Sequence, residues 1–354
     1  MSIDHLIRET EMPKPAVGLP EATEIIRAGY GISGTCHTLA GERDLNLRVD
    51  TDDQPPFLFK IWNHGQDPGV IDLQIRVLQH LQRQTPKLPV TRVIPDLQGQ
   101  DRTTFTATDG LEYTACLLSW LEGDFLREVR MTPHLADQLG RTLARLDQSL
   151  ARFSHGAAGR DMIWDVSRTH RLGDLLPSLQ GTPAHALAEK ALLRFEQNTL
   201  PVLRQLPRQV IHADFNLDNI LIAAEGHSRV CGIIDFGDAL AAPRVCDLAI
   251  ACAYQLTDSE DPLEQVVSLV SGYNEVSPLS EPEWRVLPGL IRARLVGSLV
   301  ITSHMAALHP ENQAYLLLDT RAAEARLRQM EDLDDEQQTK RLIAACQQPG
   351  DQKP

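Results

Sequence analysis

The chain has 354 residues, enough for two folded lobes or domains, because domains cluster at roughly 100–200 residues. Hydrophobic residues make up 42% of it and charged residues 23%, which argues against general disorder and against a fibrous repeat. The formal net charge of −14 argues against a large surface for nucleic-acid phosphates and favours a small cationic partner.

The six cysteines show no metal-binding spacing, and most of them lie in apolar runs. This usage is typical of reduced, buried thiols and predicts a cytoplasmic protein. The first twenty residues carry acids and prolines without an apolar core, so we expect no signal peptide. No uninterrupted apolar stretch approaches the ~20 residues that cross a bilayer, so we expect no membrane partner. The acidic net charge leads us to expect no nucleic acid as a partner.

The first third of the sequence predicts a β-rich lobe with one helix. Short apolar runs separated by polar turns predict strands near 32–39, 45–49, 57–62, 90–94, 103–106 and 113–118. Between the third and fourth runs, apolar residues recur at helical spacing from Val70 to Leu81, after a Pro68-Gly69 start. We interpret residues 1–120 as an N-lobe made of a β-sheet and one helix.

Helices dominate after Trp120. Thr132-Pro133 predicts a helix start, and leucines from Leu135 to Leu150 then fall on one helical face. Further helices are expected at about 184–198, 245–256, 262–275, 283–308 and 311–330, with one β island at 209–235. The predicted fold class is α+β: a small β-rich N-lobe, a larger helical C-lobe over 121–330 with the catalytic loop and substrate pocket, and a ligand cleft between the lobes. Residues 331–354 are expected to form a polar, partly disordered tail.

The most specific motif is the segment His212–Asn219, which apolar residues flank on both sides. Its spacing, H-x-D-x-x-x-x-N, is that of a kinase catalytic loop. Asp214 is expected to accept the proton of an attacking hydroxyl or to orient that hydroxyl. Asn219 is expected to give a neutral oxygen to Mg²⁺. For His212 we expect a buried side chain that holds the loop backbone.

A second motif follows, in which an apolar strand ends in Asp235-Phe236-Gly237. It predicts Asp235 as the main Mg²⁺ ligand beside the nucleotide phosphates. Either motif alone arises by chance, but both together, in this order and next to strands, indicate a phosphoryl-transfer enzyme.

Lys60 is the one charged residue in an apolar strand, and a buried ammonium group needs an anionic partner. We expect it to bind the nucleotide phosphates, with Asp72 on the following helix holding the lysine in place. The alternative is a lysine on an edge strand that faces water.

Two further segments are candidates for nucleotide contacts. The Gly41–Asn46 turn could cover the phosphates through Arg43 and Asn46, although it holds a single glycine. The connector after the last N-lobe strand, with Ser119 and Leu121, could present its backbone to the base. An ordinary strand exit explains this connector equally well.

Together these residues resemble the aminoglycoside phosphotransferase and choline kinase superfamily, a branch of the protein-kinase-like fold. Within it the chain is most similar to the hydroxylysine kinase family. The local features that carry this similarity are the segments Glu42–Asn46, Leu143–Asp147, Asp161–Asp165 and His309–Asn312. The superfamily often has Leu-His at Leu146-Asp147.

The resemblance implies Mg²⁺-dependent transfer of phosphate from GTP or ATP to an amino alcohol or a hydroxy amino acid, with 5-hydroxylysine as the best candidate. It also implies that a separate phospholyase-type enzyme acts in the same pathway. An aminoglycoside, ethanolamine, aminopropanol or homoserine kinase is the alternative, and a catalytically silent nucleotide-binding protein is the alternative from another class.

The sequence says less about the substrate pocket. The residues that we predict to contact the substrate are Asp238, Asp218, Trp164 and Arg292. The acids would bind an ammonium group, with Asp161 and Asp165 as further candidates, and an arginine would bind a carboxylate. For that arginine, Arg160, Arg168 and Arg294 remain open beside Arg292.

Overall fold

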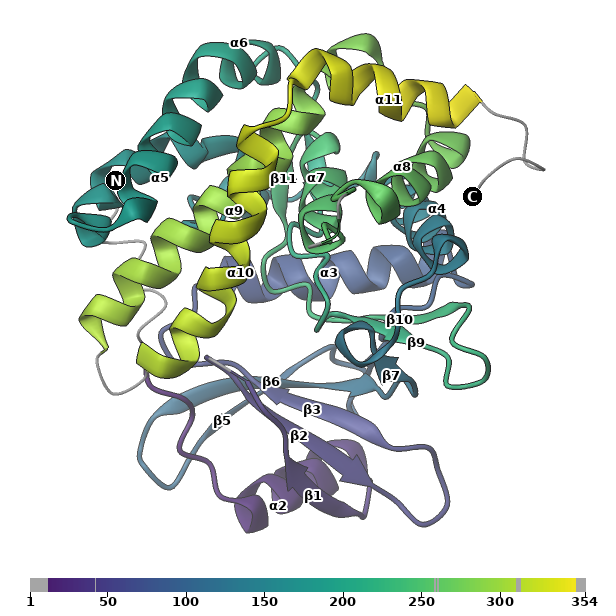
Figure 1. Ribbon diagram of the computed structural model, residues 1–354. Helices are drawn as coiled ribbons and strands as arrows, with labels where there is room; N and C mark the ends of the chain where they lie inside the picture. Colours follow the sequence, from purple (N-terminus) through teal and green to yellow (C-terminus); the bar gives the residue numbers. More distant parts are fainter. Residues whose placement is uncertain (1–11, 42, 258, 260, 310–312, 348–354) are drawn as a thin grey trace.

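The computed structural model describes residues 12–41, 43–257, 259, 261–309 and 313–347, and the backbone alone at 313–319. Glu42 and residues 310–312, which contributed to the family resemblance, lie outside the described residues, as do residues 1–11 and 348–354. A β-sheet with its helices forms one lobe, and a larger helical lobe lies above it in Figure 1.

The N-lobe is built on a six-stranded sheet in the order β1-β2-β3-β6-β4, with β5 paired to β6. Every neighbouring pair is antiparallel. The strands are β1 (Thr35–Thr38), β2 (Leu45–Asp50), β3 (Phe57–Ile61), β4 (Val93–Ile94), β5 (Thr103–Thr106) and β6 (Glu112–Ser119). All six coincide with expected strands. Two helices accompany them, α3 (Pro68–Gln84) as expected and, in addition, α2 (Leu19–Tyr30).

The two faces of this sheet belong to two different hydrophobic cores. Leu117 of β6 packs with α2 in the smaller core, while its neighbours Cys116 and Leu118 join the larger core that contains α3 and the C-lobe helices. This split follows from the pleat, which turns successive side chains to opposite faces. Any N-lobe side chain on the face of Cys116 is therefore directed toward the C-lobe.

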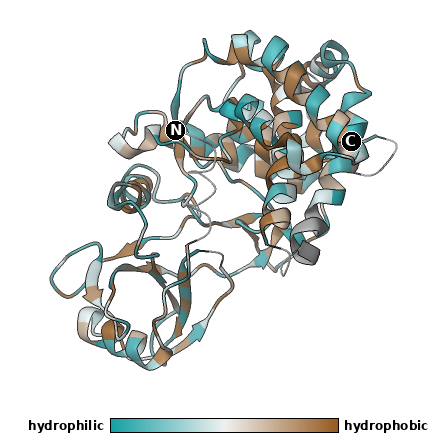
Figure 2. Ribbon diagram, turned by 90° about the vertical axis from the view of Figure 1, so that its left-hand side faces the viewer, coloured by the Kyte–Doolittle hydropathy of each residue, from teal (hydrophilic) through white to brown (hydrophobic). Residues whose placement is uncertain are grey.

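The C-lobe consists of helices around a shared apolar core, and hydrophobic residues gather where these helices face one another (Figure 2). The helices are α4 (Pro133–Leu150), α5 (Pro183–Arg194), α6 (Leu200–Leu203), α7 (Val245–Tyr254), α8 (Glu264–Val276), α9 (Glu281–Leu308), α10 (Gln313–Glu331) and α11 (Asp335–Gln347). Tighter 3₁₀ segments occur at η1 (Leu126–Glu128), η2 (Gly156–Gly159) and η3 (Val166–Leu179), and a wider π-helical turn occurs at η4 (Phe195–Thr199).

The expected start of α4 illustrates why these helices form where they do. The Thr132 side chain accepts a hydrogen bond from the backbone N–H of Leu135 at 3.2 Å, and Pro133 occupies the first turn. Leu135, Leu139 and Leu143 then recur at i, i+4 spacing and are fully buried.

Helix α9 is the central helix of the C-lobe. By length and composition it could cross a membrane, but 83% of its apolar window is buried inside the protein. It is therefore surrounded by protein on nearly all sides, and its sequence carries little amphipathic signal.

Much of the polar tail is helical. Residues 335–347 form α11, which packs on α8 and α9, within the segment 331–354 for which we expected partial disorder. The reason is a set of charge contacts: Arg292 of α9 binds Asp335 at the start of α11 and lies 3.5 Å from Glu331. A polar sequence can be ordered when its acids neutralise a buried cation.

Four short strands of the C-lobe carry the two motifs. β8 (Gln209–Ile211) pairs with β11 (Leu240–Ala242), and β9 (Ile220–Ile222) pairs with β10 (Val230–Ile233), while β7 (Asp124–Phe125) pairs with β9. The first motif runs from β8 to β9 and the second from β10 to β11. Both loops therefore leave the same two pairs of strands, which brings the motifs together.

Candidate active site

The two motif loops are bonded to each other directly. The backbone N–H of Ile234 donates to the carbonyl oxygen of Asn219 at 2.9 Å, and the Nε2 atom of His212 lies 3.0 Å from the carbonyl oxygen of Ile234. The His212 ring also packs edge-on against Phe236, with centroids 4.7 Å apart. His212 is fully buried and has the predicted place beneath the loop.

Asp247, in the first turn of α7, anchors the start of the catalytic loop. Its two carboxylate oxygens accept the backbone N–H groups of His212 and Ala213, each at 2.8 Å. Ala213 has a φ of 66°, a left-handed conformation that costs energy for a residue with a side chain. Asp247 stabilises this conformation, a function that the sequence did not single out.

Asp214 is largely buried between groups of both charges. The Nη2 atom of Arg294 lies 3.2 Å from its Oδ1 atom, and its Oδ2 atom accepts from the side-chain amides of Asn216 at 2.9 Å and Asn219 at 2.8 Å. Burial raises the pKa of Asp214 to about 6; Arg294 lowers it, and Asp238 adds to the rise. A carboxyl group with this pKa can accept a proton near neutral pH.

Asn219 and Asp235 fit a divalent ion by the chemistry of their oxygens. The Nδ2 atom of Asn219 donates to both the backbone oxygen and the carboxylate of Asp214, which fixes the amide orientation and leaves its Oδ1 atom as an acceptor. The Asp235 carboxylate is half exposed, and Lys60 keeps its pKa below the ordinary value.

Among the described residues, no group of three or more His, Cys, Asp or Glu side chains could hold a metal ion. An amide oxygen and a carboxylate suit Mg²⁺, which takes one or two protein oxygens and completes its shell with water and phosphate.

Lys60 reaches the site because of the strand pleat. Its neighbours Phe59 and Ile61 point into the smaller core, so Lys60 shares the face of its cross-strand partner Cys116 and is directed toward the C-lobe. Its Nζ atom lies 2.9 Å from Asp44 and 3.8 Å from Asp235. Burial opposes its charge, but these two carboxylates outweigh burial and raise the pKa of Lys60.

The expectation that Asp72 holds Lys60 is wrong. The Asp72 carboxylate lies 2.8 Å from Arg102 and 2.9 Å from His155, and in the described part of the chain the anionic partners of Lys60 are Asp44 and Asp235. The acid that holds the lysine thus comes from the turn before β2. Asp44 lies in that turn, next to the predicted Arg43. The strand and helix patterns of a sequence do not reveal a contact between a turn residue such as Asp44 and Lys60.

The other predicted nucleotide residues of the N-lobe lie near Lys60. Asn46 is its cross-strand partner on β2 and so shares its face of the sheet. Arg43 binds Asp238, which follows the second motif, at 3.2 Å, so this ion pair joins the turn before β2 to the C-lobe. Roles of Arg43, Asn46 and Asp238 in ligand binding stay predictions.

The connector after β6 is tied to the preceding loop. The Ser119 hydroxyl accepts the backbone N–H of Arg92 at 2.8 Å, and the Ser119 N–H donates to the Arg92 carbonyl at 2.8 Å. Leu121 is half-buried just beyond it. Contacts of Ser119 and Leu121 with a nucleotide base stay predictions.

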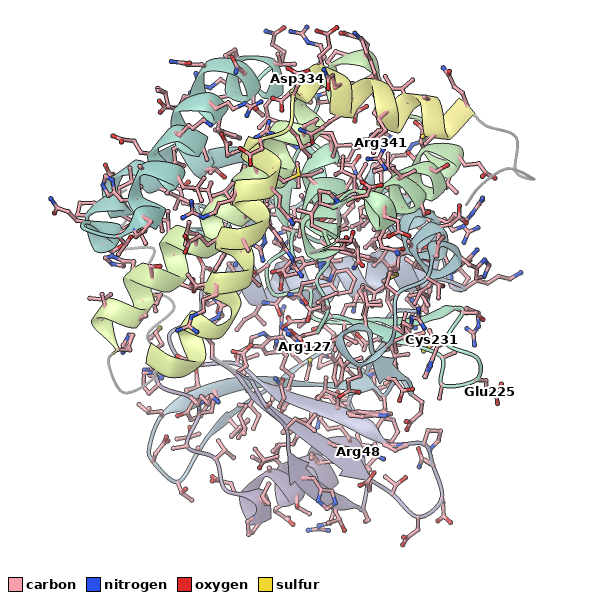
Figure 3. All side chains as sticks on the ribbon, in the orientation of Figure 1. Arg48, Arg127, Glu225, Cys231, Asp334 and Arg341 are labelled. Carbon is pink, nitrogen blue, oxygen red and sulfur yellow. The ribbon has the colours of Figure 1, made fainter. Side chains whose placement is uncertain are left out.

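Two predicted substrate residues are occupied elsewhere. The Asp218 carboxylate binds Arg127 in a two-pronged contact, at 2.6 Å from its Nε atom, and is exposed. Arg127 lies near the boundary between the lobes in Figure 3. Arg292 is buried against Glu331 and Asp335, so it anchors the tail to α9. Both expectations are corrected, because Asp218 is paired with Arg127 and Arg292 with the acids of the tail.

The arginine at Asp214 is instead Arg294, two positions further along α9. Its guanidinium carbon lies 4.9 Å from the ring centroid of Trp164 and 5.4 Å from that of Tyr254. Residues two apart on a helix point in nearly opposite directions, and α9 is buried all round, so its sequence pattern could not select Arg294 over Arg292. Trp164 contacts Arg294 and so lies next to the candidate site.

The chain is similar to known phosphotransferases. Residues 36–287 match the phosphotransferase enzyme family. The hydroxylysine kinase of Danio rerio is 25% identical over 351 residues, which cover 96% of this chain and 98% of the relative. A homoserine kinase of Zymomonas mobilis is 28% identical over 260 residues, which cover 71% of this chain and 75% of the relative.

Among solved structures, an amicoumacin kinase in complex with AMP-PNP and Ca²⁺ superposes with a TM-score of 0.67 at 14% identity, covering 90% of this chain and 96% of the other. This likeness shows the protein-kinase-like fold. Because the family match spans well over half of the sequence, the chain belongs to the phosphotransferase enzyme family.

Proposed function

We propose that the protein is a small-molecule kinase that transfers the γ-phosphate of GTP or ATP to the hydroxyl group of a hydroxy amino acid. 5-Hydroxylysine is the preferred acceptor, because the similarity to the Danio rerio hydroxylysine kinase extends over nearly the whole length of both chains. The single observation that carries the proposal is the convergence of Lys60, Asp235, Asn219 and Asp214 at the junction of the two lobes.

Each of these residues has a role in the proposed reaction. The acceptor hydroxyl oxygen attacks the γ-phosphorus, the bond from that phosphorus to the bridging β,γ-oxygen breaks, and the hydroxyl proton passes to Asp214. Asn219 and Asp235 hold Mg²⁺, which when bound neutralises charge on the phosphates. Lys60 exchanges part of its contact with Asp44 for the nucleotide phosphates. Positioning and charge neutralisation then supply most of the rate enhancement.

Homoserine is the second acceptor to consider, since a homoserine kinase is also among the relatives. The alternatives of an aminoglycoside, ethanolamine or aminopropanol acceptor share the same chemistry at the hydroxyl group. A silent nucleotide-binding protein is less well supported, because all four residues needed for transfer are present.

We also propose a cytoplasmic location and a separate phospholyase-type enzyme that consumes the phosphorylated product. The thiols of Cys36, Cys116, Cys246 and Cys252 are buried and unoxidised, which suits a reducing compartment. In a phosphorylated amino acid the phosphate is a good leaving group for such an elimination.

The test is a nucleotide-consumption screen of the purified protein with Mg²⁺ and either ATP or GTP. The acceptors are 5-hydroxylysine, homoserine, ethanolamine, 1-amino-2-propanol and an aminoglycoside. Consumption that depends on 5-hydroxylysine supports the proposal, and activity with the aminoglycoside alone would overturn the proposed acceptor. No consumption with any acceptor would overturn the kinase function itself.

A further inference from the structure

A buried guanidinium group touches the residue that is proposed to receive the acceptor proton. Arg294 is only 6% exposed, and its Nη2 atom donates to Tyr254 at 2.7 Å and to Asp214 at 3.2 Å. The proposed reaction needs the Asp214 carboxylate to accept a proton, and the Arg294 cation stabilises that carboxylate in its ionised form. The presence of Arg294 is therefore expected to serve a second purpose.

The hydrogen bonds of Arg294 are incomplete. A guanidinium group has five N–H donors, and the hydrogen bonds found within the described residues use Nη2 alone. The Nε atom is buried and has no hydrogen-bond partner in the part of the chain that the structure describes. Burying charged donors without acceptors is costly, so the remaining donors of Arg294 favour a further anionic ligand beside Asp214.

Two aromatic rings flank the guanidinium group of Arg294 and restrict its movement. Trp164 and Tyr254 both lie within stacking distance of the guanidinium carbon, at 4.9 Å and 5.4 Å. A guanidinium group held in one plane presents its donors as a fork, which matches the two oxygens of a carboxylate. A lysine could not offer this geometry.

The position of Arg294 favours the acceptor over the nucleotide as the source of that anion. The phosphates are expected beside Lys60, whose carboxylate partners are Asp44 and Asp235. Arg294 comes from α9 in the other lobe and shares Asp214, the residue that the acceptor hydroxyl must approach. An anion bound here is therefore on the acceptor.

We propose that Arg294, held by Trp164 and Tyr254, binds the carboxylate of the acceptor and makes the enzyme selective for hydroxy amino acids over the corresponding amino alcohols. This inference rests on the proposed function, since it assumes transfer to a hydroxyl group. Binding of the carboxylate draws Arg294 from Asp214, so that a correct acceptor also releases the general base.

The experiment compares each acceptor with the amino alcohol that loss of its carboxylate would leave. The pairs are 5-hydroxylysine with 1,5-diaminopentan-2-ol and homoserine with 3-aminopropan-1-ol. The measured quantity is the ratio of kcat/KM within each pair, for the wild type and for Arg294→Gln, Arg294→Lys and Tyr254→Phe. If a variant lowers activity only by disturbing Asp214, kcat/KM falls equally for both members of a pair and the ratio does not change.

The wild type should prefer the amino acid by at least about 30-fold, as expected for a charge-assisted contact. Arg294→Gln should reduce the preference to about threefold or less, chiefly by raising KM for the amino acid, while the Kd for the Mg²⁺-nucleotide is unchanged. Arg294→Lys should give an intermediate ratio, because it keeps the charge without the fork. Tyr254→Phe should lower the ratio more modestly.

Arg127→Gln is the matched control. It removes the same charge beside the catalytic loop, at the exposed contact with Asp218, and should leave the ratio unchanged. Thermal unfolding of each variant checks folding, and if Arg294→Gln does not fold, the Arg294→Lys and Tyr254→Phe ratios decide.

Three results would overturn the inference. A ratio that Arg294 variants leave unchanged, with equal losses for both members of a pair, would assign Arg294 to Asp214 or to the phosphate. A wild type that prefers the amino alcohols would sink the carboxylate site while leaving the kinase function intact. A wild type that phosphorylates no acceptor would remove the proposed function and this inference together.

Discussion

Asp214 has neighbours that act on its charge in opposite directions. Burial and Asp238 favour the protonated acid, while Arg294 favours the carboxylate, and two side-chain amides fix its orientation. The result is a pKa of about 6, close to the range in which a general base works well. Neither the charge balance nor the arginine follows from the motif spacing, because both depend on helices far away in the sequence.

Replacing Asp214 by Asn tests this role. The amide has nearly the same shape but accepts no proton, so kcat should fall by about 10²–10⁴-fold. The Kd for the Mg²⁺-nucleotide should stay within about twofold, because Lys60 and Asp235 remain. Steady-state kinetics and a binding titration measure the two quantities. Near-normal turnover would show that Asp214 is not the general base.

At the scale of the elements, the sheet was more predictable than the contacts between elements. All six N-lobe strands follow from short apolar runs, and the burial of Lys60 follows from its place in β3. The partner of Lys60 did not follow, because Asp44 lies in an irregular turn. Asp72 lies on the helix where a kinase has the acid that holds this lysine, yet its carboxylate is paired with Arg102 and His155.

This correction predicts a contrast between two variants. Lys60→Met should weaken Mg²⁺-nucleotide binding by at least about tenfold, because a desolvated charge contact to phosphate is lost. Asp72→Asn should change kcat and nucleotide affinity by less than about twofold and cost about 1 kcal/mol or less of stability, since its ion pairs are partly exposed. Equal losses of activity in the two variants would restore Asp72 as the partner of Lys60.

Helices α4 and α7 bring two buried carboxyl groups together beneath the catalytic loop. Asp147 accepts from the Tyr273 hydroxyl at 2.6 Å, and burial and the neighbouring Asp247 raise its pKa well above the ordinary value. The Oδ1 atom of Asp147 is buried and has no hydrogen-bond partner within the described residues, as expected if it carries the proton that the two groups share. Asp247 is then the ionised member that holds the loop.

The shared proton predicts a pH dependence of stability. Between the ordinary carboxyl pKa and the raised one, the folded state keeps a proton that the unfolded state has released, so stability falls as pH rises. Asp147→Asn mimics the protonated acid and removes this titration. Its stability relative to the wild type should therefore improve from pH 5 to pH 8. Urea unfolding at both values measures this, and a constant difference would exclude the shared proton.

For the whole molecule, the sequence predicted the two-lobed fold and the meeting of the two motifs, because each motif lies on a loop between short strands. It did not predict how the end of the chain closes the C-lobe. Arg292 was expected at the substrate, but α9 is buried on nearly every side, and only the folded structure shows that Arg292 faces the tail and Arg294 faces Asp214.

The contacts of the tail predict that it is required for stability. Ending the chain at Met330 removes Glu331 and Asp335 and leaves the Arg292 cation buried without its anions. The free energy of unfolding should fall by about 3–5 kcal/mol. A chain that ends at Gln347 keeps both acids and is the control. Equal urea midpoints for the two truncated chains would contradict this assignment.

The most direct test of the central claim is to observe the product. The protein is incubated with Mg²⁺, GTP or ATP and 5-hydroxylysine, and ³¹P NMR follows the phosphate. The account predicts a new phosphate monoester on the acceptor hydroxyl, formed by the wild type and almost absent with Asp214→Asn. Release of inorganic phosphate alone, or an ester formed equally by both proteins, would contradict it.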